Sequence, residues 1–274
     1  MNVDKSEEQS YKVVKANELI QRARFELDTQ EQKIVLYLIS KIKPDDEEFK
    51  WYGFKIAEFR ETLNLKGYAG GSYYEYIKEL IKKLADKSAW WTDPENEKKK
   101  TLVRWISKAR INEKNDTLEI RLDEDLKPFL LQLKEHFTQY ELWCVLRMRS
   151  QFSIRLYELL KSHLHKKDKY VKSFQLDDLR KKMSAENFPR YVDFKRRALE
   201  KAIREINDYS DLEVSYEAEM VKKSCKAITI TVKVKDVMER VRISNEFFNG
   251  AQLDMFPLFP ELKDDWDDIT DEND

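Results

Sequence analysis

Apolar residues recur at helical spacing along some segments of the chain and alternate with polar residues along others. The helical spacing predicts helices at residues 29–42, 56–63, 72–86, 151–165, 176–183 and 191–207. The alternating pattern predicts strands at 51–54 and 171–174, and hairpins with arms at 101–112 and 117–122 and at 212–218 and 227–234. Thr29 is the expected N-cap of the first helix. This mixture of segments predicts an α+β protein.

The order of these segments repeats along the chain. Leu36-Tyr37 corresponds to Leu156-Tyr157 at an offset of about 120 residues. Each half contains a long helix, a strand, a short helix, a turn, a longer helix and a hairpin, which is the plan of a winged helix-turn-helix. In that plan the second helix of the turn fills a major groove of DNA, and the hairpin reaches the adjacent backbone. We therefore expect two tandem winged helix-turn-helix domains related by internal duplication.

The first domain is expected at residues 11–136 and the second at residues 137–240, after a disordered N-terminus at residues 1–10. Residues 241–274 are expected to form a disordered acidic tail. The last 15 residues, 260–274, carry eight acidic residues and one lysine, and the whole chain carries a net charge of -1. The rest of the chain is therefore mildly basic, as in proteins that bind nucleic acid.

The two longer helices differ in charge. Residues 190–204 contain two acidic and six basic residues, the latter being Arg190, Lys195, Arg196, Arg197, Lys201 and Arg204. At about 100° per residue, Arg190, Arg197, Lys201 and Arg204 share the side opposite the apolar face. Residues 72–86 are neutral overall, although Lys78 and Lys82 lie on their outward face. We predict that the second domain reads the DNA sequence and the first grips the backbone or forms a protein interface.

Lysines also gather at both hairpins. They are Lys98, Lys99 and Lys100 in the first half and Lys222, Lys223 and Lys226 in the second. These side chains are expected to neutralise DNA phosphates. The alternative is that they only keep the hairpins from pairing with other strands.

Composition argues against several other classes of protein. The chain has five glycines and neither a GxGxxG nor a Walker A pattern, so no nucleotide cofactor is expected. The two cysteines, Cys144 and Cys225, form no CxxC motif, which is typical of a reducing compartment without structural zinc. No apolar run reaches the ~18 residues of a membrane helix.

His163-Leu164-His165 raises the alternative of a metal-dependent nicking enzyme of the rolling-circle type, with Tyr157 or Tyr170 as nucleophile. On a helix ending at residue 165 the two histidines would point about 200° apart and could not share one metal. We therefore expect no catalytic or metal site. Trp90, Trp91 and Trp105 are expected to pack in the core or sheet, or else to stack on single-stranded bases.

Several motifs in order resemble the replication initiator (Rep) family of iteron plasmids. They are residues 13–20 (VVKANELI), 27–33 (LDTQEQK), 153–160 (SIRLYELL), 194–197 (FKRR) and 202–207 (AIREIN). The resemblance spans about residues 11–237. It implies two winged-helix domains that bind repeated origin sites, or iterons, in double-stranded DNA, in the bacterial cytoplasm.

The resemblance also implies partners. In the family, monomers start replication, and dimers formed through the first domain often repress the initiator's own gene. The host initiator and replicative helicase are the expected protein partners, and no nucleotide or metal cofactor is expected. The alternative is a transcriptional repressor of the same fold without a replication role.

The tail contains Gln252-Leu253-Asp254-Met255-Phe256, which is similar to the short peptides that bind the bacterial sliding clamp. Such peptides use a glutamine amide and two apolar anchors. The alternative is a tail segment whose apolar residues pack on the body of the protein.

Overall fold

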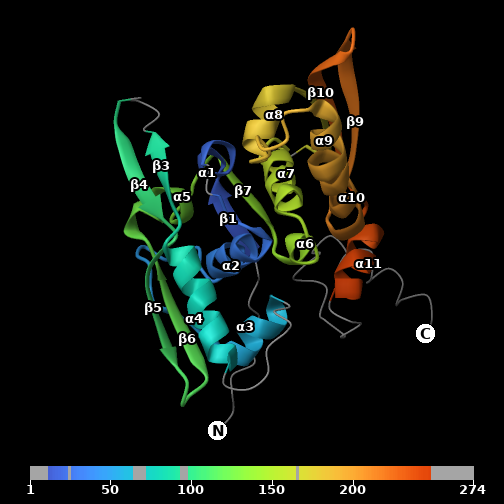
Figure 1. Ribbon diagram of the computed structural model, residues 1–274. Helices are drawn as coiled ribbons and strands as arrows, with labels where there is room; N and C mark the ends of the chain where they lie inside the picture. Colours follow the sequence, from blue (N-terminus) through green and yellow to red (C-terminus); the bar gives the residue numbers. More distant parts are fainter. Residues whose placement is uncertain (1–11, 24–25, 64–71, 93–97, 165–166, 248–274) are drawn as a thin grey trace, which may run out of the picture.

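The computed structural model describes residues 12–23, 26–63, 72–92, 98–164 and 167–247 (Figure 1). The first half comprises β1 (Lys12–Ala16), α1 (Asn17–Arg22), α2 (Thr29–Ile39), β2 (Tyr52–Lys55), α3 (Ile56–Thr62), α4 (Ser72–Ala85), β3 (Ser88–Thr92), β4 (Lys100–Arg104), β5 (Ile106–Asn112), β6 (Thr117–Leu122), η1 (Glu124–Leu126) and α5 (Lys127–Leu130). The second comprises β7 (Phe137–Glu141), α6 (Trp143–Leu146), α7 (Gln151–Lys161), β8 (Lys169–Gln175), α8 (Leu176–Lys182), α9 (Tyr191–Phe194), η2 (Lys195–Leu199), α10 (Glu200–Tyr209), β9 (Leu212–Val221), β10 (Ser224–Val234) and α11 (Val237–Phe247).

Both halves build the same three-stranded antiparallel sheet. Its order is β2-β6-β5 in the first half and β8-β10-β9 in the second. A further internal likeness joins the two helices of each turn: Arg60 of α3 lies 5.3 Å from the ring centre of Tyr73, and Arg180 of α8 lies 5.5 Å from that of Phe194. The prediction of an α+β protein with two winged-helix domains is confirmed.

A polar residue caps α2 in the first half of the chain and α7 in the second. Asp28, and not Thr29 as predicted, caps α2: its carboxylate accepts the N–H of Glu31, while the Glu31 carboxylate accepts the N–H of Asp28. Ser150 caps α7. The caps lie 122 residues apart, and both helices have 11 residues. The predicted offset of 120 residues, which paired Leu36-Tyr37 with Leu156-Tyr157, is therefore two residues shorter than the offset between these two helices.

The prediction of a single arm at residues 101–112 is wrong. The arm is divided at Trp105, whose side chain is buried, and its two parts belong to different sheets. β4 pairs with β3, a strand that the alternation did not reveal, whereas β5 pairs with β6. The β3–β4 and β5–β6 hairpins extend in opposite directions in Figure 1. Lys98, Lys99 and Lys100 therefore belong to the β3–β4 hairpin and not to the wing of the three-stranded sheet.

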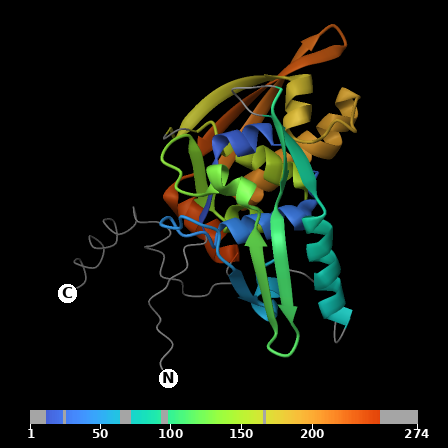
Figure 2. The same ribbon diagram turned by 90° about the vertical axis from the view of Figure 1, so that its left-hand side faces the viewer.

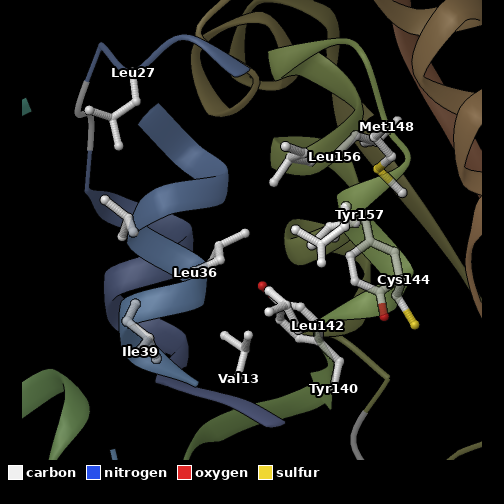
Figure 3. Close-up of a cluster of buried hydrophobic side chains, with 14 of the residues drawn as sticks. Val13, Leu27, Leu36, Ile39, Tyr140, Leu142, Cys144, Met148, Leu156 and Tyr157 are labelled. Atoms are coloured by element: carbon white, nitrogen blue, oxygen red, sulfur yellow. The ribbon is translucent and has the colours of Figure 1, made fainter. Parts of the chain in front are cut away.

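The two domains share one continuous core. Figure 3 shows α2 facing α7, with Leu36 and Leu156 in the space between the two helices. β1, at the start of the first domain, pairs along its length with β7, so the linker segment is part of the join. The domain boundary at residue 137 stays a prediction.

A buried ion pair also joins β1 to α7. The Nζ of Lys15 on β1 lies 2.7 and 3.0 Å from the two carboxylate oxygens of Glu158 on α7. The hydroxyl of Tyr140 donates to the same carboxylate at 2.7 Å. Burial lowers the pKa of Lys15, and the charge of Glu158 opposes that shift. Breaking such a pair leaves an unpaired buried charge, so the pair favours the present placement of β1 against α7.

The start of the predicted tail is helical. α11 runs to Phe247, buries Val241 and Ile243, and packs against α6. Residues 241–247 are therefore helical and not a disordered tail. Residues 1–10 and the acidic segment after residue 247, with Gln252-Leu253-Asp254-Met255-Phe256, lie outside the described residues. Within the described ranges, no helix has the length and apolar character needed to cross a membrane.

Candidate nucleic-acid interface

The longer helices of the two turns lie on the same side of the molecule. In Figure 2, α4 (teal) and the helices of the second domain's turn (gold) lie along one edge. A duplex lying along this edge would meet both of them.

The second of these helices is not a regular α-helix. Between α9 and α10, η2 is a π-helical turn, in which the N–H of Glu200 donates to the carbonyl of Lys195, five residues earlier. Such a turn holds one residue more than an α-helical turn and is often found at functional sites. Arg190 is the N-cap of α9 and lies outside the helix. The predicted alignment of Arg190 with Arg197, Lys201 and Arg204 at a uniform 100° per residue is therefore wrong.

The π-turn keeps one side of this long helix exposed. Exposed residues recur every four positions, at Val192, Arg196, Glu200, Arg204 and Asp208. In an uninterrupted α-helix each four-residue step would rotate the side chain by roughly 40°, so the row would wind toward the core. The extra residue in η2 counters that rotation, while Phe194, Ala198 and Leu199 remain buried.

The predicted cations of this helix differ in their partners. Arg190 lies 2.6 Å from Asp193 and Lys195 lies 3.5 Å from Glu200, so both are partly neutralised. Arg197 is exposed and lies 5.9 Å from the ring centre of Phe188. Within the described part of the chain, no carboxylate lies within 4 Å of the cationic groups of the remaining three, which are Arg196, Lys201 and Arg204. Arg196 and Arg204 are exposed and Lys201 is half-buried.

The two predicted cations of α4 differ in whether carboxylates neutralise them. Lys78 is exposed, but its Nζ lies 2.7 Å from Glu75 and 2.6 Å from Glu113. Its hydrogen bonds to Glu113 and Glu75 raise the pKa of Lys78. Lys82 is exposed, and no carboxylate of the described residues lies within 4 Å of it. The first domain therefore offers a weaker attraction for phosphates along this helix.

The hairpin of the second domain carries two of its predicted lysines at the tip. Lys222 and Lys223 form the two-residue turn between β9 and β10, and both are exposed. Lys222 has a φ of 56°, a left-handed conformation found at such turns. Lys226 instead lies within β10 as the extra residue of a β-bulge, and it is also exposed. The lysines Lys98, Lys99 and Lys100 are exposed on the β3–β4 hairpin.

The sequence reasoning missed charged residues at the join beside α10. Glu205 of α10 accepts the backbone N–H groups of Arg149 and Ser150, at 3.0 and 3.1 Å, and so supports the start of α7. Lys33 of α2 faces this group: burial lowers the pKa of Lys33 to about 8, Glu205 opposes that shift, and Arg149 adds to it. These residues lie far apart in sequence, so no local pattern reveals them.

The first histidine of the alternative nicking site does not lie on a helix, contrary to the prediction. α7 ends at Lys161, so His163 lies in the following turn, where its Nδ1 is 3.4 Å from the Nζ of Lys172. The reasoning that placed both histidines on a helix is therefore wrong, and His165 lies outside the described residues. The described residues contain no group of three or more His, Cys, Asp or Glu side chains that could hold a metal.

The three tryptophans differ in burial, whereas both cysteines are buried. Trp105 is buried and Trp91 packs against Phe129, as predicted, but Trp90 is 67% exposed on β3. Cys144 and Cys225 are both buried free thiols, and burial raises the pKa of each.

Comparison with known proteins identifies the family to which this chain belongs. Residues 12–161 match the family model described as "Initiator Replication protein, WH1", and residues 175–232 match "Initiator Rep protein, WH2". A replication initiation protein of Escherichia coli is 25% identical over 211 residues, which cover 74% of this chain and 64% of that relative. The chain thus spans less than two thirds of the relative's length.

A crystal structure of selenomethionine derivatives of domains 2 and 3 of RctB aligns with a TM-score of 0.44 at 11% identity, covering 76% of this chain and 82% of that chain. The first family match alone covers more than half of the chain, and the second follows it in the expected order. Because the chain has two winged-helix domains and matches both family models in order, it belongs to the family of initiator replication (Rep) proteins.

Proposed function

We propose that this protein initiates plasmid replication by binding repeated origin sites in double-stranded DNA through both winged-helix domains. The observation that carries this proposal is a set of four cations on η2 and α10 that no carboxylate of the described residues approaches within 4 Å, namely Arg196, Arg197, Lys201 and Arg204. They lie on the same side as α4, where carboxylates bind Lys78 and Lys83. Arginine fork donors pair with guanine in the major groove, so the second domain reads bases while the first grips the backbone.

The experiment is footprinting of the purified full chain on DNA flanking its own gene. Protection of several direct repeats beside an AT-rich stretch supports an initiator. Protection of a lone inverted repeat supports the alternative, a transcriptional repressor with the same fold and no replication role. Equal affinity for repeat-containing and shuffled fragments would contradict sequence-specific binding of either kind.

Dimer formation through the first domain is part of the proposal, with repression of the protein's own gene as its consequence. Trp90 and Leu102 are direct cross-strand partners on β3 and β4, and their side chains are 67% and 39% exposed. This exposed apolar pair on a two-stranded sheet is the proposed contact for a second copy. Sedimentation of wild type and Trp90→Ser tests it: an unchanged monomer–dimer equilibrium would contradict this contact.

Recruitment of the host initiator and replicative helicase is inferred from family membership. Binding of Gln252-Leu253-Asp254-Met255-Phe256 to the sliding clamp is inferred from the sequence motif alone. A pull-down with immobilised clamp tests the motif. Leu253→Ala and Phe256→Ala should abolish retention, and retention equal to that of wild type would dispose of the idea.

A further inference from the structure

A polar cavity of about 220 Å³ lies where α1, in the first half of the chain, meets α7 and α8 in the second half. Its lining residues are Gln21, Arg22, Ala23, Arg155, Asp178, Lys181 and Lys182. Figure 1 shows α1 and α8 flanking α7 at the same end of the molecule. The volume is several times the ~30 Å³ that one water molecule occupies in the liquid, so a hydrated phosphate group fits.

Positive charge dominates the cavity. Four of its lining residues are cationic, and Asp178 is the one carboxylate among them. Arg22 lies 3.6 Å from Glu18, and Lys182 lies 3.8 Å from Asp178, both beyond hydrogen-bonding distance. Within the described residues, no carboxylate lies within 4 Å of the exposed Lys181. By contrast, Lys78 on α4 has two carboxylates within 2.7 Å.

Helix electrostatics explains only part of this arrangement. Lys181 and Lys182 occupy the last turn of α8, where cations interact favourably with the carbonyl end of any helix. That effect does not bring Arg22 and Arg155 to the same cavity from two other helices. Arg155 is held there by a hydrogen bond from its Nη2 to the carbonyl of Ala23, at 2.9 Å, which orients its guanidinium across the domain boundary.

We propose that this cavity between the domains is a binding site for a phosphate group. Arg22 and Arg155 supply planar donors, and Lys181 and Lys182 supply ammonium groups, the set that proteins use for phosphate. Because α1 and α8 belong to different domains, a bound phosphate would bridge them and favour their present arrangement. The phosphate comes either from a DNA backbone or from a free phosphate compound.

The DNA source is tested with a random-sequence duplex, for which only backbone contacts matter. Affinity is measured for wild type, Arg22→Ala and Lys181→Ala at several salt concentrations. If each side chain neutralises one DNA phosphate, the slope of log affinity against log salt should become shallower by about 0.9 for each variant. Lys169→Ala is the matched control, because Lys169 is exposed at the end of β8 remote from α8 and does not line the cavity.

The free source is tested with inorganic pyrophosphate at matched ionic strength. Pyrophosphate should raise the melting temperature of wild type and of Lys169→Ala, and not that of Arg22→Ala or Lys181→Ala. Both cavity side chains are exposed, so the variants should melt normally without ligand.

A changed salt slope assigns the site to a DNA phosphate, and a lost pyrophosphate response with an unchanged slope assigns it to a free phosphate compound. No difference from Lys169→Ala in either measurement would overturn the proposal. The salt-slope experiment rests on the proposed DNA binding but not on recognition of repeats. A protein that showed no specificity for repeats could therefore still give the expected change of slope. The pyrophosphate arm is independent of DNA.

Discussion

α4 and the α9–α10 helix hold the same place in two copies of one fold, yet they present opposite patterns of charge. At the 122-residue offset that relates them, Glu75 and Glu79 of α4 stand where the second helix has Arg197 and Lys201. On α4, Lys78 is bound by Glu75 and Glu113. A cation held by two carboxylates of its own protein must give them up before it binds a phosphate, so a similar fold need not give a similar interface.

The comparison also separates structural charges from binding charges. Lys83 of α4 and Glu205 of α10 are counterparts; Lys83 contacts the N-cap residue of α2 and Glu205 that of α7. Lys83 binds the capping carboxylate of Asp28 at 2.7 Å. Glu205 accepts the N–H of Ser150, a neutral cap. Each side chain thus has the charge that its partner can bind: the cation of Lys83 meets the carboxylate of Asp28, and the carboxylate of Glu205 meets the N–H of Ser150. Neither side chain is available for DNA.

Removing one residue from the π-turn should have the largest effect on DNA binding. Deletion of Lys195 brings Phe194 to α-helical spacing from Ala198 and Leu199, so the core face survives, while Val192 and Arg196 come to lie three residues apart and the exposed row is broken between them. If the exposed row includes two base-reading arginines, the loss on the specific site should be about 2–6 kcal/mol. Titrations on specific and random duplexes measure it.

The matched control is Lys195→Ala, which removes the same charge and keeps the length of the turn. It should weaken binding to all sequences by a similar small factor. If deletion and substitution behave alike on the specific site, the π-turn does not set the geometry of base contact.

The join beside α10 should be sensitive to pH through Lys33. Its folded-state pKa of about 8 lies below the 10.5 of an unperturbed lysine, so between these values the unfolded chain holds more protons. The contribution of Lys33 to the free energy of unfolding should therefore rise as pH increases from about 8 to 10.5. Lys33→Met should be the more stable protein at pH 7, by up to about 3 kcal/mol, and this advantage should shrink at pH 9.5. Urea unfolding of both proteins at the two pH values measures the difference; a difference independent of pH would contradict it.

Substitution of residues at equivalent positions tests directly whether the second domain reads bases while the first grips the DNA backbone. Arg204 of α10 and Lys82 of α4 are both exposed and stand at the same place in the two helices. Arg204→Ala should cost about 1–3 kcal/mol on the specific site and much less on random DNA, because a base contact is lost. Lys82→Ala should weaken both by the same smaller amount. Equal losses on random and specific DNA for Arg204→Ala would reassign that arginine to the backbone.

The smallest effect is expected from releasing Lys78. The double variant Glu75→Gln and Glu113→Gln removes both of its carboxylate partners and leaves similar side-chain shapes. The salt slope on random duplex should then become steeper by up to about 0.9, because one more phosphate can be neutralised. Since exposed pairs contribute little to folding, the free energy of unfolding should stay nearly unchanged. An unchanged slope would show that α4 does not face the backbone.

Much of the fold could be predicted because its determinants are local. The apolar spacing placed α3, α4 and α8 within about a residue of their observed ends, since each buries one regular face. The arm at 101–112 was misjudged because β4 and β5 form one nearly continuous strand pattern, and only the partners β3 and β6 separate them. The end of α7 was placed four residues late, at a position where polar residues allow either a helix or a turn.

The candidate interface was predicted in composition and only partly in geometry. The basic residues of α9–α10 are mostly exposed, as their spacing against the apolar face indicated. The π-turn was not foreseen, because a choice between hydrogen bonds to the fourth or fifth preceding carbonyl depends on how Phe194 and Leu199 both reach the core. The cavity at Arg22 and Lys181 joins segments about 160 residues apart and leaves no periodic signal.

The sequence by itself determined the order of the elements, their duplication and the total charge of each helix, because these depend on neighbours along the chain. Only the tertiary structure decided which charges are neutralised: Glu113 reaches Lys78 from another hairpin, and Asp28 reaches Lys83 from another helix. Coulomb energy depends on distance through space and on burial, and neither is a property of a residue's place in the sequence. For that reason carboxylates bind most of the lysines of α4, whereas most of the basic residues along η2 and α10 have no carboxylate of the described residues within 4 Å.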